Sequence, residues 1–110
     1  MSYDVSFKAK LEGTDQWVPV GADWINHTSN TAAMIKEVCG SYPSAWDGRT
    51  CKDLLPILRS GIELLQRDPD HYRSYEPGNR WGTVESTLEF LRAIADNCRI
   101  YPTAVIEVSY

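Results

Sequence analysis

The chain has 110 residues, of which 43% are apolar and 24% are charged, and its formal net charge is −4. These values predict one soluble globular domain over residues 1–110, and a mildly acidic chain without a basic stripe makes nucleic-acid binding an unfavoured function. No apolar run approaches the roughly 20 residues that a membrane span requires, and the N-terminus lacks the pattern of a secretory signal.

The first part of the chain predicts two strands. Residues 3–11 (YDVSFKAKL) alternate between apolar and polar side chains, which is the pattern of a half-exposed strand. Residues 17–24 (WVPVGADW) follow a turn and form the expected return strand. Because Pro19 cannot donate a backbone hydrogen bond, we expect this strand at an edge of the sheet. Trp17 and Trp24 belong to this strand and are candidates for the core.

Helical periodicity begins after the second strand. The apolar residues Met34, Ile35 and Val38 recur at helical spacing, and they predict a first helix over about 30–39. Gly40 supplies a stop signal for this helix.

Two further helices are predicted before the last strand. An apolar stripe over 54–65 predicts the second helix, which we expect to begin near Asp53 because Pro56 is tolerated only in a first turn. Thr50 and Asp53 have the spacing of a capping box. Thr83 is the expected N-cap of the third helix.

Residues 103–110 (TAVIEVSY) alternate again and predict a closing strand. The expected order along the chain is therefore β-β-α-α-α-β. This order favours an α+β two-layer sandwich, in which a small antiparallel sheet of about three strands is packed by three helices. We expect the first strand to be central, with the last strand on its free edge.

The cysteine and histidine residues give no metal-binding pattern. The three cysteines contain no CxxC pair, and none of the residues has the short spacing of a structural zinc site. We expect the thiols to be reduced and structural, and we predict no metal site and no cofactor. The residues considered are Cys39, Cys51, Cys98, His27 and His71.

No catalytic constellation stands out either. Glu85 and Glu89 are four residues apart, and we expect both on a solvated helix face. The sequence has no nucleophile-elbow motif and no glycine-rich phosphate loop. We therefore predict that the protein is not an enzyme, and we assign no catalytic residue.

Binding is the stronger signal, and it lies in two loops rich in aromatic and cationic residues. These are 41–49 (SYPSAWDGR) and 71–82 (HYRSYEPGNRWG), and they combine the residue types that are enriched in interface hot spots. Two interpretations compete, because loop aromatics can either contact a partner or plug an open end of the core. The candidate partner-binding residues are Tyr72, Arg73, Tyr75, Arg80, Trp81 and Trp46.

The two interpretations apply to different parts of these loops. For Trp46 and Trp81 the plug is the favoured interpretation, although both stay on the candidate list. Tyr72 and Tyr75 sit mid-loop among charged residues, so we expect 72–75 (YRSY) to be the best exposed recognition surface.

Three stretches of the chain stand out together. They are 26–30 (NHTSN) followed by Met34, then 76–82 (EPGNRWG), and 98–104 (CRIYPTA) before the last strand. In these stretches the chain resembles a family of small uncharacterised proteins carried by bacteriophages and prophages. The resemblance covers about residues 24–108. It implies a phage or prophage setting and assigns no activity or site residues.

Together these observations predict a non-enzymatic phage accessory protein that binds a host or defence-system protein. The expected location is the cytoplasm of an infected or lysogenic bacterium. Two alternatives remain open. One is a small-molecule, nucleotide-like binding domain that uses Trp81, Tyr72 and nearby arginines. The other is a virion or assembly component that forms a homo-oligomer through the edge strand 17–24.

Overall fold

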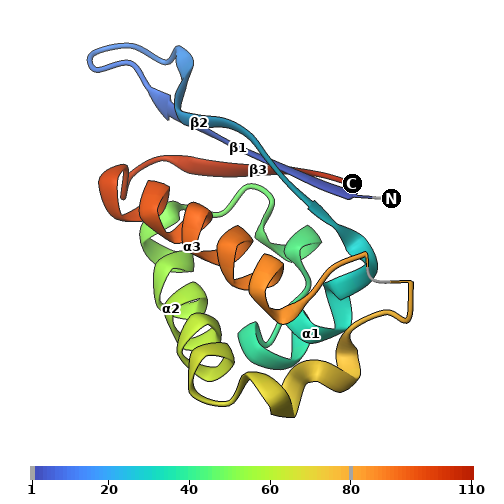
Figure 1. The fold of residues 1–110 in the computed structure, drawn as a ribbon. Coiled ribbons are helices and arrows are strands. Elements are labelled where there is room, and N and C mark those ends of the chain that lie inside the picture. Colours follow the sequence, from blue (N-terminus) through green and yellow to red (C-terminus); the bar gives the residue numbers. More distant parts are fainter. Residues whose placement is uncertain (1, 80) are drawn as a thin grey trace.

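The computed structural model describes residues 2–79 and 81–110. The chain follows the order β-β-α-α-α-β and is of the α+β class, so both predictions are confirmed (Figure 1). Short 3-10 helices occupy Ser29–Thr31, Pro43–Trp46 and Pro69–Tyr75. The strands and α-helices are β1 (Ser2–Lys10), β2 (Trp17–Thr28), α1 (Ala32–Cys39), α2 (Cys51–Arg67), α3 (Val84–Ile100) and β3 (Val105–Ser109).

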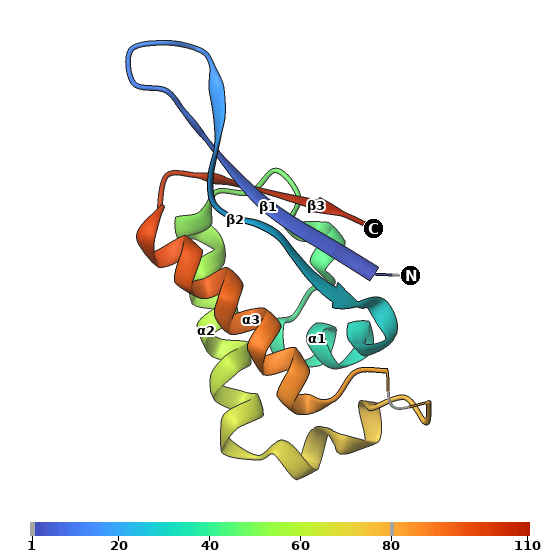
Figure 2. The ribbon, with the colours of Figure 1, turned by 45° about the horizontal axis from the view of Figure 1, so that its top comes forward.

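The sheet is antiparallel, with the strand order β2-β1-β3. The predictions that the first strand is central and that the strand with Pro19 lies at an edge are therefore confirmed. The β1–β2 hairpin extends beyond the helical layer (Figure 2).

A loop closes the outer edge of β3. The backbone N–H of Gly48 donates to the carbonyl of Ile106, and the N–H of Ile106 donates to the carbonyl of Arg49, both at 2.9 Å. The N–H of Val108 donates to Asp47 Oδ1 at 2.9 Å. This edge is consequently satisfied within the chain, because its backbone groups pair with the segment 47–50.

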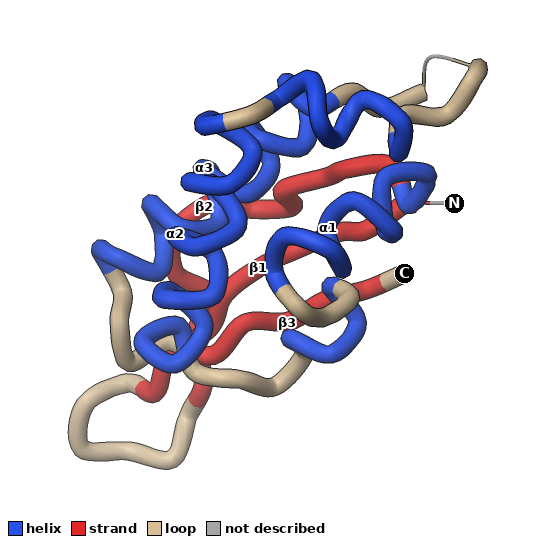
Figure 3. Tube along the Cα trace, turned by 90° about the horizontal axis from the view of Figure 1, so that it is seen from below, coloured by secondary structure: helices blue, strands red, loops and turns tan. Residues whose placement is uncertain are grey.

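All three α-helices lie on one face of the sheet (Figure 3). Their apolar sides meet the inward side chains of β1 and β3 in a single core, where burial of each large aliphatic or aromatic side chain contributes about 1.5–3 kcal/mol. The largest side chains with almost no exposed surface are Val5, Phe7, Met34, Ile35, Trp46, Leu54, Leu58, Leu65, Val84, Leu91, Ile94 and Ile106. The other face of the sheet carries no helix among the described residues.

Of the two predicted helix caps, the one at Thr83 is confirmed and the one at Thr50 is wrong. Thr83 caps α3 as expected, and its hydroxyl accepts from the N–H of Ser86 at 3.0 Å. The capping box at Thr50 is wrong, since its side chain makes no cap hydrogen bond and α2 begins at Cys51. Carbonyl groups from the segment before β3 satisfy the first turn instead: Cys51 N–H donates to Ala104 and Lys52 N–H to Pro102, at 2.8 and 2.9 Å.

Candidate functional site

The side of the sheet away from the helices, which we call the open face, carries polar, charged and tryptophan side chains that are exposed or half-exposed. Strand alternation sends Tyr3, Val5 and Phe7 into the core, so their neighbours on β1 face outwards. Cross-strand pairing then places partners from the two edge strands beside them. The open face consists of Ser2, Asp4, Ser6, Lys8, Lys10, Trp17, Pro19, Trp24, Asn26, Glu107 and Ser109.

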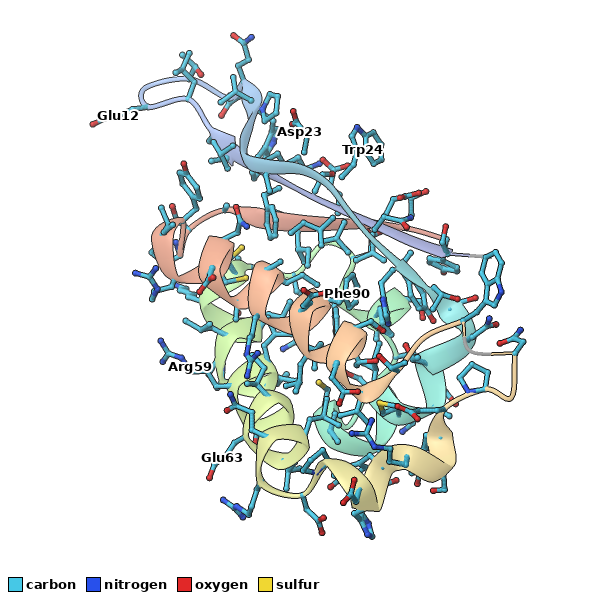
Figure 4. The ribbon with its side chains drawn as sticks, viewed as in Figure 1. Glu12, Asp23, Trp24, Arg59, Glu63 and Phe90 are labelled. Atoms are coloured by element: carbon cyan, nitrogen blue, oxygen red, sulfur yellow. The ribbon has the colours of Figure 1, made fainter. Side chains whose placement is uncertain are left out.

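A large bulge interrupts β2 in the middle of this face. Val5 pairs with Ile25, whereas Phe7 pairs with Val20, so the whole segment 21–24 lies opposite Ser6 alone. Trp24 ends the bulge with a φ of 50°, a left-handed conformation that bulky residues rarely adopt. Its ring is 66% exposed and stands on the side of the sheet away from the helices, with Asp23 beside it (Figure 4).

Helix α3 holds the bulge in place. The Ala22 N–H donates to Asn97 Oδ1 at 2.9 Å, and Asn97 Nδ2 donates to the carbonyl of Ala93 at 2.8 Å. Gly21 has a φ of 68°, and a Cβ at this position would lie 2.3 Å from Asn97 Oδ1. Only glycine therefore fits the close approach of the bulge to α3. The position of Trp24 is thus set by contacts with the helical layer.

Two recesses meet at Trp24. The first, of about 350 Å³, runs from Trp24 to Trp17 and is lined by Ser6, Phe7, Lys8, Trp17, Val18, Pro19, Asp23, Trp24 and Glu107. The second, of about 300 Å³, lies on the β3 side and is lined by Asp4, Ser6, Trp24, Asp47, Glu107, Val108 and Ser109. Since Ser6, Trp24 and Glu107 line both, we treat the two as one feature and call it the Trp24 groove.

Charge is unevenly distributed along the Trp24 groove. At one end the ammonium groups of Lys8 and Lys10 lie over the Trp17 ring, 5.3 and 5.5 Å from its centroid. Lys8 also pairs with Glu107 at 3.7 Å. The Trp24 end is lined by carboxylates. The groove can accordingly offer an aromatic surface bordered by negative charge.

The prediction that 72–75 is an exposed recognition surface is wrong for Tyr72, its first residue. Tyr72 is only 8% exposed and belongs to the core, and Tyr75 is half-buried against it. Tyr72 is turned inwards because Pro69–Tyr75 forms a 3-10 helix that packs on the helical layer. These aromatic side chains therefore contribute to packing.

Arg73 lies on the surface, but acidic neighbours engage it. Its guanidinium donates to both oxygens of Glu85, at 2.8 and 2.9 Å, and to Glu76 at 3.0 Å and Asp70 at 3.3 Å. These hydrogen bonds, with Glu85 first, raise the pKa of Arg73, and the same contact lowers the pKa of Glu85. Arg73 thus ties the loop to the first turn of α3.

Of the two candidate tryptophans, Trp46 is buried and Trp81 is exposed. Trp46 is fully buried and its Nε1–H donates to Ser41 Oγ at 2.9 Å, as the plug interpretation predicted. Trp81 is 69% exposed, so the plug interpretation is wrong for this residue. The Trp81 ring borders a polar recess at the end of the sheet, beside Asn26. Arg80 lies outside the described residues.

The suggestion that Trp17 and Trp24 belong to the core is also wrong. Trp17 is 42% exposed, and Val20 of the same strand packs against the core in its place. Strict alternation counted back from Val20 places Trp17 on the outer side. For Trp24 the sequence offers no such signal, because the bulge resets the alternation.

His27 is a buried polar residue at the junction of β2, α1 and α3. Its Nε2 lies 2.7 Å from Thr31 Oγ1, and its ring stacks on Phe90 with the centroids 4.8 Å apart. Burial lowers the pKa of His27 to about 4, so the imidazole is neutral near pH 7.

The cysteines are free, and burial raises the pKa of the Cys39 thiol to about 12.

Across residues 2–79 and 81–110, no group of three or more His, Cys, Asp or Glu side chains is placed to hold a metal ion. Nor does any helix in this part of the chain have the length and apolarity to cross a bilayer. No protein-family model matches the chain, and neither a curated protein nor a solved structure matches it significantly.

Proposed function

We propose that this protein is a non-enzymatic binding domain that docks a partner protein on the open face of its sheet. The observation that carries the proposal is Trp24, a 66% exposed tryptophan in left-handed backbone, held by a bulge anchored to α3. A non-glycine residue in this conformation costs on the order of 1 kcal/mol, and exposure forgoes the gain from burying the ring. Tryptophan is also among the residues enriched at the centres of protein interfaces.

The nature of the partner follows from the resemblance to small phage and prophage proteins. We infer that the partner is a host or defence-system protein, met in the cytoplasm of the infected bacterium. Loss of that partner's normal contacts would be the functional outcome of docking.

The two alternatives have less support. A nucleotide-like site built on Trp81, Tyr72 and nearby arginines keeps only Trp81 as an exposed stacking surface, because Tyr72 is buried and Arg73 is engaged with Glu85. Assembly through the edge of β2 is disfavoured, because Pro19 and the bulge both disrupt pairing with a second strand.

A steric block of the Trp24 groove tests the proposal. Ser6→Tyr places a ring at the centre of the groove, on a central strand that tolerates aromatic residues. The matched control is Ser60→Tyr, an exposed position on α2. Each immobilised protein is exposed to a lysate of a bacterial host, and retained proteins are identified and their affinities measured.

We expect the wild type and Ser60→Tyr to retain the same partner, and Ser6→Tyr to bind it at least about tenfold more weakly, a loss of about 1.4 kcal/mol. Circular dichroism confirms that both variants are folded. Equal retention by Ser6→Tyr would place the contact elsewhere. A wild type that repeatedly retains nothing would contradict the proposed function.

A further inference from the structure

We infer that the Trp24 groove accepts a basic segment of a partner protein, with an arginine side chain lying over the Trp24 ring. The inference rests on the proposed function and names the chemistry of the partner at the same site.

The charges that line the groove favour a cationic occupant. Four carboxylates line the groove: the recess towards Trp17 contains Asp23, the recess on the β3 side contains Asp4 and Asp47, and Glu107 lines both. Lys8 is the one cation in these two linings, and it already pairs with Glu107 at 3.7 Å. A ligand with matching positive charge is attracted, whereas a like-charged one is repelled.

The carboxylates retain acceptor capacity. Asp47 Oδ1 accepts from the N–H of Val108 at 2.9 Å, and Asp4 Oδ1 accepts from Asn26 Nδ2 at 2.8 Å. Both hydrogen bonds hold the carboxylates in fixed positions, and both leave the second oxygen, Oδ2, to other donors. Because an ionised carboxylate accepts through both of its oxygens, an incoming guanidinium finds acceptors already in place.

The two tryptophans of the groove differ in what covers them. Trp17 already has the ammonium groups of Lys8 and Lys10 over its ring. Within the described residues, no cation lies over Trp24, whose ring remains 66% exposed. Trp24 is therefore the aromatic surface on which an external cation can stack, and tryptophan is the best aromatic partner for a cation.

Arginine fits this arrangement better than lysine. Its planar guanidinium stacks on an aromatic ring while its N–H groups donate to carboxylates at the edge, and it is less strongly hydrated than an ammonium. Nucleic acids are disfavoured since their phosphates would meet the same carboxylates. A second copy of the chain is disfavoured too, because each copy carries a net charge of −4.

A titration with defined peptides tests the inference. The probe is acetyl-Gly-Arg-Gly-Arg-Gly-amide, compared with the same peptide carrying glutamine in place of arginine. Both are added to the ¹⁵N-labelled chain of residues 1–110, and binding is followed by NMR at the indole Nε1–H of Trp24. We expect saturable shifts with the arginine peptide, a Kd at least about tenfold lower than for the glutamine peptide, and weaker binding as salt is raised.

Matched variants separate a site from general charge attraction. Asp23→Asn with Glu107→Gln removes two carboxylates from the groove, and Glu37→Gln with Asp53→Asn removes two exposed carboxylates from α1 and α2. We expect the first pair to weaken arginine-peptide binding at least about tenfold and the second pair to weaken it less than about twofold.

Trp24→Gly provides a variant that removes the ring and keeps the fold, because glycine adopts the positive φ of this position without strain. We expect its arginine-peptide binding, followed at the amide of Ser6, to be lost. Equal binding of both peptides, equal weakening by both double variants, or unchanged binding by Trp24→Gly would overturn the inference.

The outcomes distinguish this inference from the proposed function. If Ser6→Tyr loses a protein partner while the arginine peptide fails to bind, the docking face stands and the arginine inference falls. If sedimentation instead detects a dimer through the open face, the occupant is a second copy and the inference is likewise overturned.

Discussion

Trp24 and His27 lie three positions apart on β2, yet one is displayed and the other is buried. Hydrophobicity alone would place them the other way round. The bulge accounts for Trp24, and the contacts of His27 with Thr31 and Phe90 account for its burial. At both residues, tertiary contacts override what hydrophobicity alone would predict.

The burial of His27 makes stability depend on pH. Its pKa in the folded protein is about 4, below the ordinary value of 6.5, so the unfolded chain binds the proton more readily. Stability is therefore fully present above about pH 6.5 and falls as the pH is lowered towards 4, with a total loss of roughly 3 kcal/mol. Urea unfolding at several pH values measures this loss.

His27→Gln is the control, because it keeps a polar side chain and cannot titrate. Between pH 7 and 5, where most carboxylates stay ionised, we expect the wild type to lose stability with decreasing pH and the variant to change little. If stability depended on pH in the same way in the wild type and in His27→Gln, the titration of His27 would not be its cause.

Single residues also show what the sequence could predict. The buried faces of β1 and β3 follow from alternation, and the outward side of Trp17 follows from the core-packed Val20 in the same way. The orientation of Trp24 does not, because it depends on a hydrogen bond from Ala22 to Asn97, 75 positions away. Local pattern carries no information about such a contact.

At the scale of elements, the order of strands and helices was predictable, since each has a clear period and a boundary signal. Strand β2 extends to Thr28, beyond the predicted 17–24, because the bulge restores pairing and turns Ile25 and His27 towards the core. The start of α2 was misplaced because carbonyl groups near β3, far along the chain, satisfy its first turn.

The 71–82 loop shows that local sequence does not predict which aromatic side chains of a loop are buried. Its proline, glycine and charged residues indicate an exposed segment. Residues 71–75 nevertheless belong to the 3-10 helix that begins at Pro69. Whether an aromatic side chain of such a turn points inwards depends on the neighbouring helices, which the local sequence does not specify. Tyr72 is buried for this reason, while Trp81 further along remains exposed.

Truncation of Tyr72 tests this assignment. We expect Tyr72→Ala to lower the free energy of unfolding by about 3 kcal/mol, because it removes a buried aromatic side chain. The neighbouring His71 is exposed, and His71→Ala should change stability by less than about 0.5 kcal/mol. Chemical denaturation of both variants measures the difference, and a Tyr72→Ala protein as stable as the wild type would return this residue to the candidate surface.

In the molecule as a whole, the helices of the described residues pack on one face of the sheet, and no described helix covers the other (Figures 1 and 3). The class of the fold was predictable from element order, because three amphipathic helices need a common apolar surface. The side that would remain open, and the residues gathered there from three strands, depend on register and on the bulge. The candidate site therefore lies on the sheet, whereas the sequence predicted it in a loop.

We expect the open face, and not the 71–82 loop, to contact the partner protein. An NMR footprint of the ¹⁵N-labelled protein in complex with the partner retained from lysate tests this directly. We expect the amides of Ser6, Trp24 and Glu107 to be perturbed and those of 72–79 to be unchanged. Perturbation centred on 72–79, with the open face unchanged, would contradict it.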